Sequence, residues 1–158
     1  MKIDIGCGAN KKEGFFGVDA IAFPGVDYIG SFDDYLDRLP DDSVSEFYMS
    51  HFVEHLSSDD RIDLFNRLYR VMKPRATGEI ICPDWSCDAA YGDPTHKWPP
   101  ISAWTFMYLD GDWRKINAPH TPYLCDFRAS ISREIYSEIT LIKCRITSLK
   151  FVKERVQA

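Results

Sequence analysis

The opening stretch Met1-Lys-Ile-Asp-Ile-Gly-Cys-Gly8 and the shorter stretch Gly17-Val-Asp19 decide the fold. The first is an apolar run that ends in two closely spaced glycines, and the second is a short run closed by a carboxylate. Glycines at the end of a strand let the backbone approach a ligand closely, and an acid that ends the next strand can accept hydrogen bonds from ribose hydroxyls. The two stretches therefore predict two strands and a nucleoside-cofactor site.

The spacing between these stretches argues against a dinucleotide. A dinucleotide fingerprint has a third glycine, a helix under the pyrophosphate and an acid about 20 residues further on. Here Lys11 stands in place of the third glycine, and Asp19 follows Gly8 too closely for a full helix between them. We expect residues 9–16 to form a loop in place of the first helix. Such a loop can hold a ribose and a small charged group, which fits S-adenosylmethionine.

The rest of the chain alternates strand and helix patterns. Strands are expected over 26–29, 45–49 and 78–84, and the polar stretch 30–34 is expected to be a loop. A helix that begins at Ser57 and runs to Pro74 places its apolar residues at three- and four-residue steps: Ile62, Phe65, Leu68, Tyr69 and Met72. Residues 130–139 suggest a short capped helix and 140–155 suggest strands. The pattern predicts a Rossmann-like, doubly wound α/β fold, mostly parallel, with an antiparallel C-terminal edge strand.

The two opening stretches resemble motifs I and II of class I S-adenosylmethionine-dependent methyltransferases, in particular small members of the methyltransferase type 11 group. The stretch Ser50-His-Phe-Val-Glu-His-Leu56 and the turn at Lys73-Pro74 before Gly78 add to the resemblance, which covers roughly residues 1–84. In that family an acid and an apolar residue follow the third strand and contact adenine; here that place holds Ser31, Phe32 and Asp33. The resemblance implies S-adenosylmethionine as the cofactor, bound by Asp4, Gly6, Cys7, Gly8, Asp19, Ala20, Ser31, Phe32, Asp33, Ser50 and His51.

A methyl transfer from a sulfonium needs a base only if the acceptor must lose a proton. The candidate catalytic residues are His51, His55 and His96, because histidine titrates near neutrality, and Asp84 at the end of the fifth strand. Each of them could equally be structural.

Two alternatives to an active methyltransferase stay open. The stretch from His51 to His55 also satisfies the His-x-x-Glu-His zinc pattern, with Glu54 between the histidines and Glu134 as a distant third ligand. The position of this stretch after a strand argues against that zinc hydrolase, so no metal site is expected. The second alternative is a non-catalytic domain that keeps the methyltransferase-like fold and only binds the cofactor.

Residues 85–128 differ in composition from the rest. They hold all four tryptophans and several prolines, and they suggest one helix over about 101–109. An irregular segment after a parallel strand can cover the cofactor and form the acceptor pocket, and aromatic faces attract a sulfonium cation. The same aromatic residues could instead fill the core or form a dimer contact.

Composition narrows the class of protein. A length of 158 residues fits one domain over residues 1–158, and a net charge of −5 argues against a nucleic-acid substrate. The five cysteines include no Cys-x-x-Cys pair, so reduced, buried thiols are expected. The sequence shows no secretory leader or long apolar run, which favours a cytoplasmic protein that makes no membrane contact. We expect a methyltransferase that acts on an oxygen or nitrogen of a small-molecule acceptor, and a homodimer is compatible with the aromatic segment.

Overall fold

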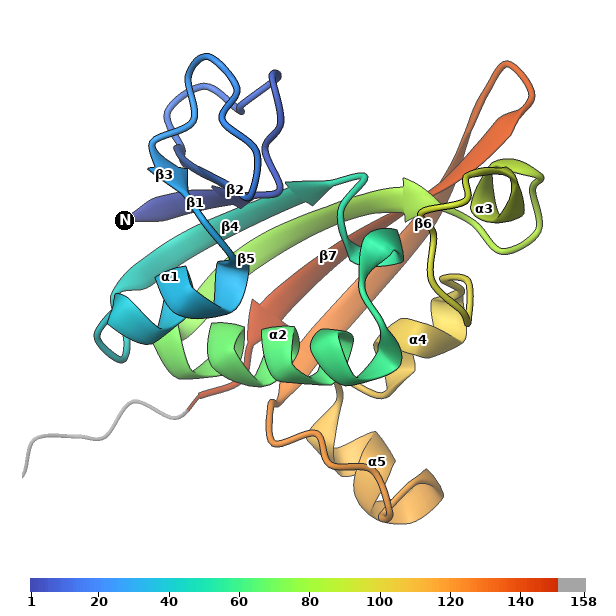
Figure 1. The fold of residues 1–158 in the computed structure, drawn as a ribbon. Coiled ribbons are helices and arrows are strands. Elements are labelled where there is room, and N and C mark those ends of the chain that lie inside the picture. The colour runs from blue at the N-terminus through green and yellow to red at the C-terminus, as the bar shows by residue number, and fades with distance from the viewer. Residues whose placement is uncertain (151–158) are drawn as a thin grey trace, which may run out of the picture.

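The computed structural model describes residues 1–150, which form one seven-stranded sheet flanked by helices (Figure 1). The strand order is β3-β2-β1-β4-β5-β7-β6. Strands β1 to β5 pair in parallel, whereas β7 runs antiparallel to β5 and β6. The strands are β1 (Lys2–Ile5), β2 (Phe16–Asp19), β3 (Tyr28–Ile29), β4 (Val44–Ser50), β5 (Met72–Pro83), β6 (Phe127–Tyr136) and β7 (Ile139–Ser148). The predicted fold class is confirmed.

The connection from β1 to β2 is a loop, as predicted. Residues 6–15 contain turns and bends and no helix. Phe15 of this loop is buried and packs edge-on against Tyr48 of β4, with ring centroids 6.3 Å apart. The loop therefore buries apolar surface of its own although the usual first helix is missing.

Two helices, α1 (Phe32–Arg38) and α2 (Ser58–Val71), pack against each other beside the sheet (Figure 1). Helix α2 begins as predicted, because Ser57 and Asp60 form a reciprocal capping box. It ends at Val71, earlier than expected, because the backbone becomes extended at Met72. Helix α1 was not predicted: part of it lies in the stretch expected to be a loop, and its N-cap is Ser31, whose Oγ accepts from the Asp34 N–H at 3.4 Å.

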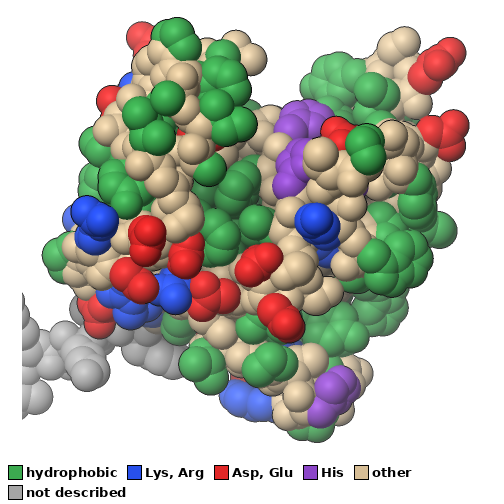
Figure 2. All heavy atoms as spheres, in the orientation of Figure 1, with side chains coloured by type: hydrophobic (Ala, Val, Ile, Leu, Met, Phe, Trp, Pro, Cys, Tyr) green, Lys and Arg blue, Asp and Glu red, His purple; other side chains and the backbone are tan. Residues whose placement is uncertain are grey.

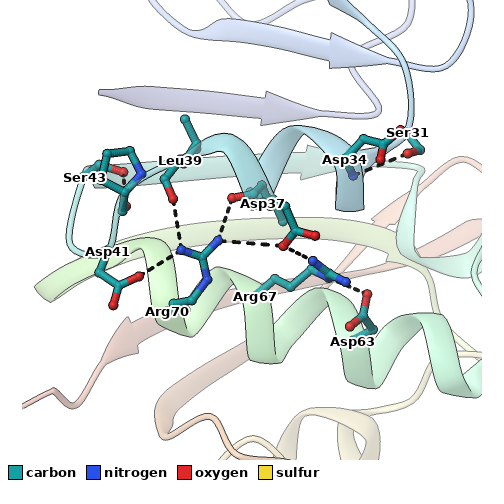
Figure 3. Close-up of polar contacts among 11 residues, drawn as sticks. Ser31, Asp34, Asp37, Leu39, Asp41, Ser43, Asp63, Arg67 and Arg70 are labelled. Atoms are coloured by element: carbon teal, nitrogen blue, oxygen red, sulfur yellow. Dashed lines mark hydrogen bonds and ion pairs between the residues drawn. The ribbon is translucent and has the colours of Figure 1, made fainter.

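Arginines of α2 hold α1 in place (Figure 3). Arg67 forms an ion pair with Asp37. Arg70 donates to the carbonyl oxygens of Leu36, at 2.7 Å, and Leu39, at 2.9 Å. These bonds supply donors to carbonyl groups at the C-terminal end of α1, where the Leu36 oxygen also accepts from the Leu39 N–H at 3.1 Å. They fix the position of a helix that is too short to be stable alone.

A close approach in the middle of the sheet requires a glycine. Phe47 of β4 pairs with Gly78 of β5, and the Phe47 side chain is fully buried. A Cβ atom added to Gly78 would lie 2.1 Å from the Phe47 ring. Gly78 therefore lets this ring lie across the neighbouring strand and fill the core.

The helix expected over 130–139 is wrong, because these residues belong to a hairpin. Strand β6 pairs with β7 residue for residue, from Phe127 opposite Ser148 to Tyr136 opposite Ile139. The four-residue spacing of Ile131, Ile135 and Ile139 looks helical, but antiparallel pairing determines the structure. The strands expected over 140–155 are confirmed for β7, and residues 151–155 lie outside the described part of the chain.

The aromatic-rich segment contains three short helices, α3 (Ala89–Gly92), α4 (Ala103–Met107) and α5 (Gly111–Asn117). Helix α4 confirms the one expected over about 101–109. Ile101, Phe106 and Leu109 are buried in the main hydrophobic core. Figure 1 places α3 beyond the carboxyl ends of β4 and β5, whereas α4 and α5 extend past α2. The segment thus contributes to the core as well as to one end of the sheet.

The cysteines are in the state that the sequence predicts. All five cysteines are free and buried, as expected: Cys7, Cys82, Cys87, Cys125 and Cys144. Among the described residues, no helix has both the length and the apolar character that crossing a membrane requires.

Candidate active site

Two cavities meet at Gly6, beyond the carboxyl end of β1. The smaller, of about 200 Å³, is lined mainly by apolar groups, and the larger, of about 370 Å³, lies beside the loop that follows Gly6. Of the predicted cofactor residues, the smaller cavity is lined by Gly6, Asp19, Ala20, Ser31 and Phe32. The larger is lined by Asp4, Gly6, Cys7, Gly8, Ser50 and His51. Asp33, on α1, lies outside the lining of both cavities.

Backbone hydrogen bonds shape the loop between the cavities. Gly6 has φ +68° and Gly8 has φ +53°, so both adopt the left-handed conformation that favours glycine. Asp19 accepts from the Gly8 N–H through Oδ2, at 2.8 Å, and from the Ile21 N–H through Oδ1, at 2.9 Å. The carboxylate that ends β2 therefore holds the glycine loop and keeps a free lone pair on each oxygen.

Asp4 organises the other end of the same loop. Its side chain is almost fully buried, and its Oδ2 accepts from the Lys12 N–H at 2.7 Å. Burial raises the pKa of this carboxyl, although the hydrogen bond from Lys12 opposes the shift. Asp4 thus ties the loop that replaces the first helix to the floor of the larger cavity.

Phe52 is a residue of this site that the sequence patterns did not reveal. A Cβ atom added to Gly6 would lie 2.2 Å from Cδ2 of Phe52, so the ring rests against the glycine backbone. Phe52 also meets Phe32 edge-on, at 6.0 Å between centroids, on the lining of the smaller cavity. Its position directly after Ser50 and His51, at the end of a predicted strand, could have indicated that Phe52 lines the site. The sequence pattern points to the neighbouring histidines instead.

The structure brings together three of the four candidate bases. His51, at φ +54°, places its Nδ1 3.3 Å from Oε1 of Glu54. The Glu54 carboxylate raises the pKa of His51 above its ordinary value, against the effect of partial burial. The rings of His55 and His96 meet edge-on with centroids 4.8 Å apart. Histidine side chains lie together beside the hollow of this face in Figure 2.

The segment that carries these histidines is not an α-helix. His51 follows the end of β4, and residues Val53–His55 form a single turn of 3-10 helix, η1. The helical face on which the zinc-hydrolase pattern depends is therefore absent from residues 50–56. Glu134, its proposed third ligand, lies on β6, where it accepts from the Tyr136 hydroxyl at 2.6 Å.

A buried arginine joins η1 to the segment that contains His96. Arg61 of α2 is 3% exposed, and its guanidinium donates to the carbonyl oxygens of Val53 at 3.1 Å, Lys97 at 3.1 Å and Pro99 at 2.6 Å. Burial lowers the pKa of Arg61. The Lys97 N–H in turn donates to the carbonyl oxygen of Glu54 at 2.9 Å. The helix periodicity gave no indication of this role, because it marked only apolar positions.

Asp84, the fourth candidate base, is fully buried and has charged and polar partners of its own. Its Oδ1 accepts from the Ser86 N–H at 2.9 Å, and its Oδ2 accepts from Nε of Arg133 on β6 at 2.8 Å. Burial would raise the pKa of Asp84, but the Ser86 and Arg133 contacts outweigh it and lower the pKa. The side chain links the end of β5 to the hairpin and lies outside the lining of both cavities.

No protein-family profile matches the sequence, and a search of curated proteins found no relative. Solved structures do match. A SAM-dependent methyltransferase from Archaeoglobus fulgidus has a TM-score of 0.70 at 20% identity, covering 93% of this chain and 85% of its own. The 1,6-didemethyltoxoflavin-N1-methyltransferase of Burkholderia thailandensis, with 1,6-didemethyltoxoflavin and S-adenosylhomocysteine bound, has a TM-score of 0.67 at 9% identity, covering 94% of this chain and 71% of its own. A SAM-dependent methyltransferase from Methanosarcina mazei has a TM-score of 0.63 at 15% identity, covering 95% and 92%.

The chain has the class I methyltransferase fold. In this fold the strand order reverses between β1 and β4, and ligands of open α/β sheets bind outside the carboxyl ends of the strands at such a point. The larger cavity lies there, because residues 6–10 after β1 and residues 50–51 at the end of β4 line it. The smaller cavity extends from Gly6 and Phe52 to the ends of β2 and β3, where residues 18–20 and 30–32 line it. The topology of the methyltransferase fold and the position of the cavities therefore agree.

Proposed function

We propose that this chain is an S-adenosylmethionine-dependent methyltransferase that transfers a methyl group to an oxygen or nitrogen of a small-molecule acceptor. The observation that supports this most strongly is the pair of cavities that meet at Gly6 and have Asp19 on the lining of the smaller one. The Burkholderia thailandensis neighbour, whose structure holds a small-molecule substrate and S-adenosylhomocysteine, supports the same class of acceptor.

The residues present fit this cofactor. The two oxygens of Asp19 each hold one backbone N–H, which leaves a lone pair on each for ribose hydroxyls. Phe32 and Phe52 offer apolar faces for a base in the smaller cavity. Among the described residues, none apart from its chain neighbours lies within 4 Å of a Cβ added to Gly8, so the backbone there is open to a ligand. We propose that the other residues predicted from the sequence also contact S-adenosylmethionine: Asp4, Cys7, Ala20, Ser31, Asp33 and Ser50.

The cofactor supplies an activated methyl group, so the chain has to orient the acceptor and exclude water. His51 is the proposed base for an acceptor that must lose a proton, because it lines the larger cavity. His55 and His96 are the next candidates for the base; they lie near Glu54, on which His51 also rests. Asp84 is the last candidate base, because its carboxylate oxygens already accept from Ser86 and Arg133.

Finer assignments belong to the same proposal. The motifs at Ser50–Leu56 and Lys73–Pro74 support placement among the small type 11 members. We also propose that residues 85–128 cap the site in a single domain, and that the protein is cytoplasmic, where its five free thiols stay reduced. A homodimer and the absence of nucleic-acid partners remain proposals.

Calorimetric titration with S-adenosylhomocysteine tests the proposed function. The wild-type chain should bind saturably, and Asp19→Ala should raise Kd roughly 10- to 150-fold, because the lost hydrogen bonds to a charged group are worth about 1.5–3 kcal/mol. Asp112→Ala is the control, because Asp112 is exposed on α5 and pairs only with Lys115 among its described neighbours. Absence of binding by the wild-type chain would refute the proposal. Tight binding without turnover of any acceptor in a broad panel would favour a non-catalytic binding domain.

A further inference from the structure

Glu54 is a buried carboxylate that its protein neighbours do not satisfy. The residue is 4% exposed, and neither carboxylate oxygen has a hydrogen-bond partner among residues 1–150. His51 is nearby, with its Nδ1 3.3 Å from Oε1, but without hydrogen-bond geometry. A buried carboxylate without a hydrogen bond is costly, and native structures pair such groups with a hydrogen-bond donor or a cation.

Two histidines converge on this carboxylate. A carboxylate oxygen of Glu54 and one ring nitrogen each of His55 and His96 all lie within 4.8 Å of one another. A zinc ion with ligands at about 2 Å holds them roughly 3.3 Å apart, so closing on an ion needs side-chain shifts of about an ångström. Both histidines are partly exposed, which leaves a path for an ion to enter.

Hydrogen bonds assign the tautomers of the two histidines. The Thr95 hydroxyl donates to Asp93 at 2.6 Å, so its oxygen accepts from Nδ1–H of His55 at 2.9 Å. Nδ1 of His96 lies 3.3 Å from the carbonyl oxygen of Ala90, which can only accept, so this nitrogen also carries the hydrogen. Both rings therefore keep a lone pair on Nε2. Histidines that bind metals have this arrangement, with the other ring nitrogen bonded to a carbonyl or a similar acceptor.

We propose that Glu54, His55 and His96 bind a divalent transition-metal ion beside the larger cavity. Two imidazoles and one carboxylate favour zinc, manganese or iron over magnesium or calcium. Three protein ligands leave coordination positions open. This ligand set differs from the His-x-x-Glu-His pattern, because His96 comes from the segment after β5 and His51 is not among the three ligands.

The position of the ion suggests the class of acceptor. His51, beside Glu54, lines the larger cavity, so the proposed ion lies at the edge of the space where an acceptor would enter. A bound metal ion acts as a Lewis acid and lowers the pKa of an oxygen ligand. On the proposed methyltransferase function, on which this step rests, the acceptor carries a hydroxyl or carboxylate oxygen that can bind the ion. The metal site itself does not depend on that function.

The metal-stripped 158-residue chain, without cofactor or acceptor, provides the test. Calorimetric titration with ZnCl₂ and MnCl₂ should show about one ion per chain and saturable binding, and cobalt-loaded protein should show visible absorption that reports nitrogen and oxygen ligands. Loss of an outer partner already costs about 10–100-fold in affinity, so Glu54→Gln and His96→Ala should each weaken binding by roughly 100-fold or more. His120→Ala, at an exposed histidine outside the cluster, should bind like the wild type.

Three results of these titrations would contradict the proposed metal site. Absence of zinc and manganese binding, binding of magnesium alone, or unchanged zinc affinity in both ligand variants would each overturn the metal site. Glu54→Gln keeps the shape of the side chain, and circular dichroism of each variant checks the fold. If His96→Ala fails to fold, Thr95→Val tests the orientation of His55 instead and should weaken zinc binding. Because no cofactor is present, failure here leaves the S-adenosylhomocysteine titration as an independent test of the methyltransferase.

Discussion

The cavities around Gly6 and the cluster of Glu54, His55 and His96 are neighbours that the chain builds in different ways. The Gly6 cavities depend on bonds between residues close in sequence, such as Asp19 with Gly8 and Asp4 with Lys12. The histidine cluster depends on segments about 40 residues apart, which Arg61 of α2 joins from a third element. Local bonds hold the glycine loop of the first site, although Phe52 also packs against Gly6. The second site requires α2 and the segment after β5 to be in place together.

The largest expected effect comes from removing Arg61, which should break the cluster and spare the Gly6 cavities. In Arg61→Met, the buried carbonyl oxygens of Val53, Lys97 and Pro99 lose their donor. Each such loss costs about 1–3 kcal/mol, so the loss of three donors should lower the free energy of unfolding by at least about 3 kcal/mol. Urea denaturation measures this loss, and titrations of the folded variant should show weaker zinc binding with S-adenosylhomocysteine affinity nearly unchanged.

Arg67→Met is the matched control for this prediction. Arg67 is on the same helix, but its ion pairs with Asp37 and Asp63 are partly exposed to solvent, and exposed pairs contribute about 0–1 kcal/mol each. Equal destabilisation by both variants, or equal loss of both ligands in Arg61→Met, would show that the two sites are not held separately.

The same contrast explains how much of the molecule could be predicted from the sequence. The glycine loop, Asp19 and the parallel strands could be predicted, because each depends on a short stretch whose residues interact with one another. Helix α1 could not, because it spans about two turns and its C-terminal end is held by Arg70 of α2, which donates to the Leu36 and Leu39 carbonyl oxygens. Strand β6 could not, because its isoleucine spacing is helical while pairing with β7 determines its conformation.

The candidate site also contains residues that the sequence predicts and contacts that it does not predict. Ten of the eleven predicted cofactor residues line the two cavities, because they follow strand ends that the topology brings to one edge of the sheet. His96 was singled out, but its contact with His55 was not, since nothing local relates positions 55 and 96. Arg61 was missed because a buried arginine whose partners are carbonyl groups of other segments leaves no periodic pattern.

Replacing Gly6 should have the opposite effect to replacing Arg61. In Gly6→Ala, the new Cβ would lie 2.2 Å from Cδ2 of Phe52, and φ at this position is +68°. Overpacking costs about 1–3 kcal/mol and a left-handed alanine about 1 kcal/mol more, so the loss of stability should be about 2–4 kcal/mol. S-adenosylhomocysteine binding should be lost and zinc binding retained, as titration of the folded fraction would show.

Gly8→Ala separates the cost of the left-handed backbone from the cost of the clash with Phe52. Gly8 has φ +53°, but in residues 1–150 only its chain neighbours come within 4 Å of an added Cβ, so this variant should lose only the backbone contribution of about 1 kcal/mol. Adding Phe52→Ala to Gly6→Ala should recover part of the lost stability by removing the clash. If Gly8→Ala proves as destabilising as Gly6→Ala, the Phe52 contact does not explain the need for glycine at position 6.

The smallest effect concerns Asp84, which anchors the start of the segment that leads to His96. The partners of Asp84 lower its pKa below the ordinary carboxyl value, so its contribution to stability is fully present above the unfolded-state pKa of about 3.9 and is lost as pH falls through the folded-state pKa. At pH 7, Asp84→Asn should be about 1–3 kcal/mol less stable, because the Arg133 bond loses its charged acceptor. Urea denaturation of both proteins should show this difference shrinking below about pH 4.

Arg133→Gln completes this comparison, because it removes the charge from the other side of the same bond. If the ion pair fixes the segment, both variants should weaken zinc binding modestly while S-adenosylhomocysteine affinity stays constant, since Asp84 lies outside the lining of the Gly6 cavities. A stability difference between wild type and Asp84→Asn that stays constant with pH would show that the carboxylate charge is not what holds β5 to the hairpin. A drop in S-adenosylhomocysteine affinity would instead mean that the end of β5 supports both sites.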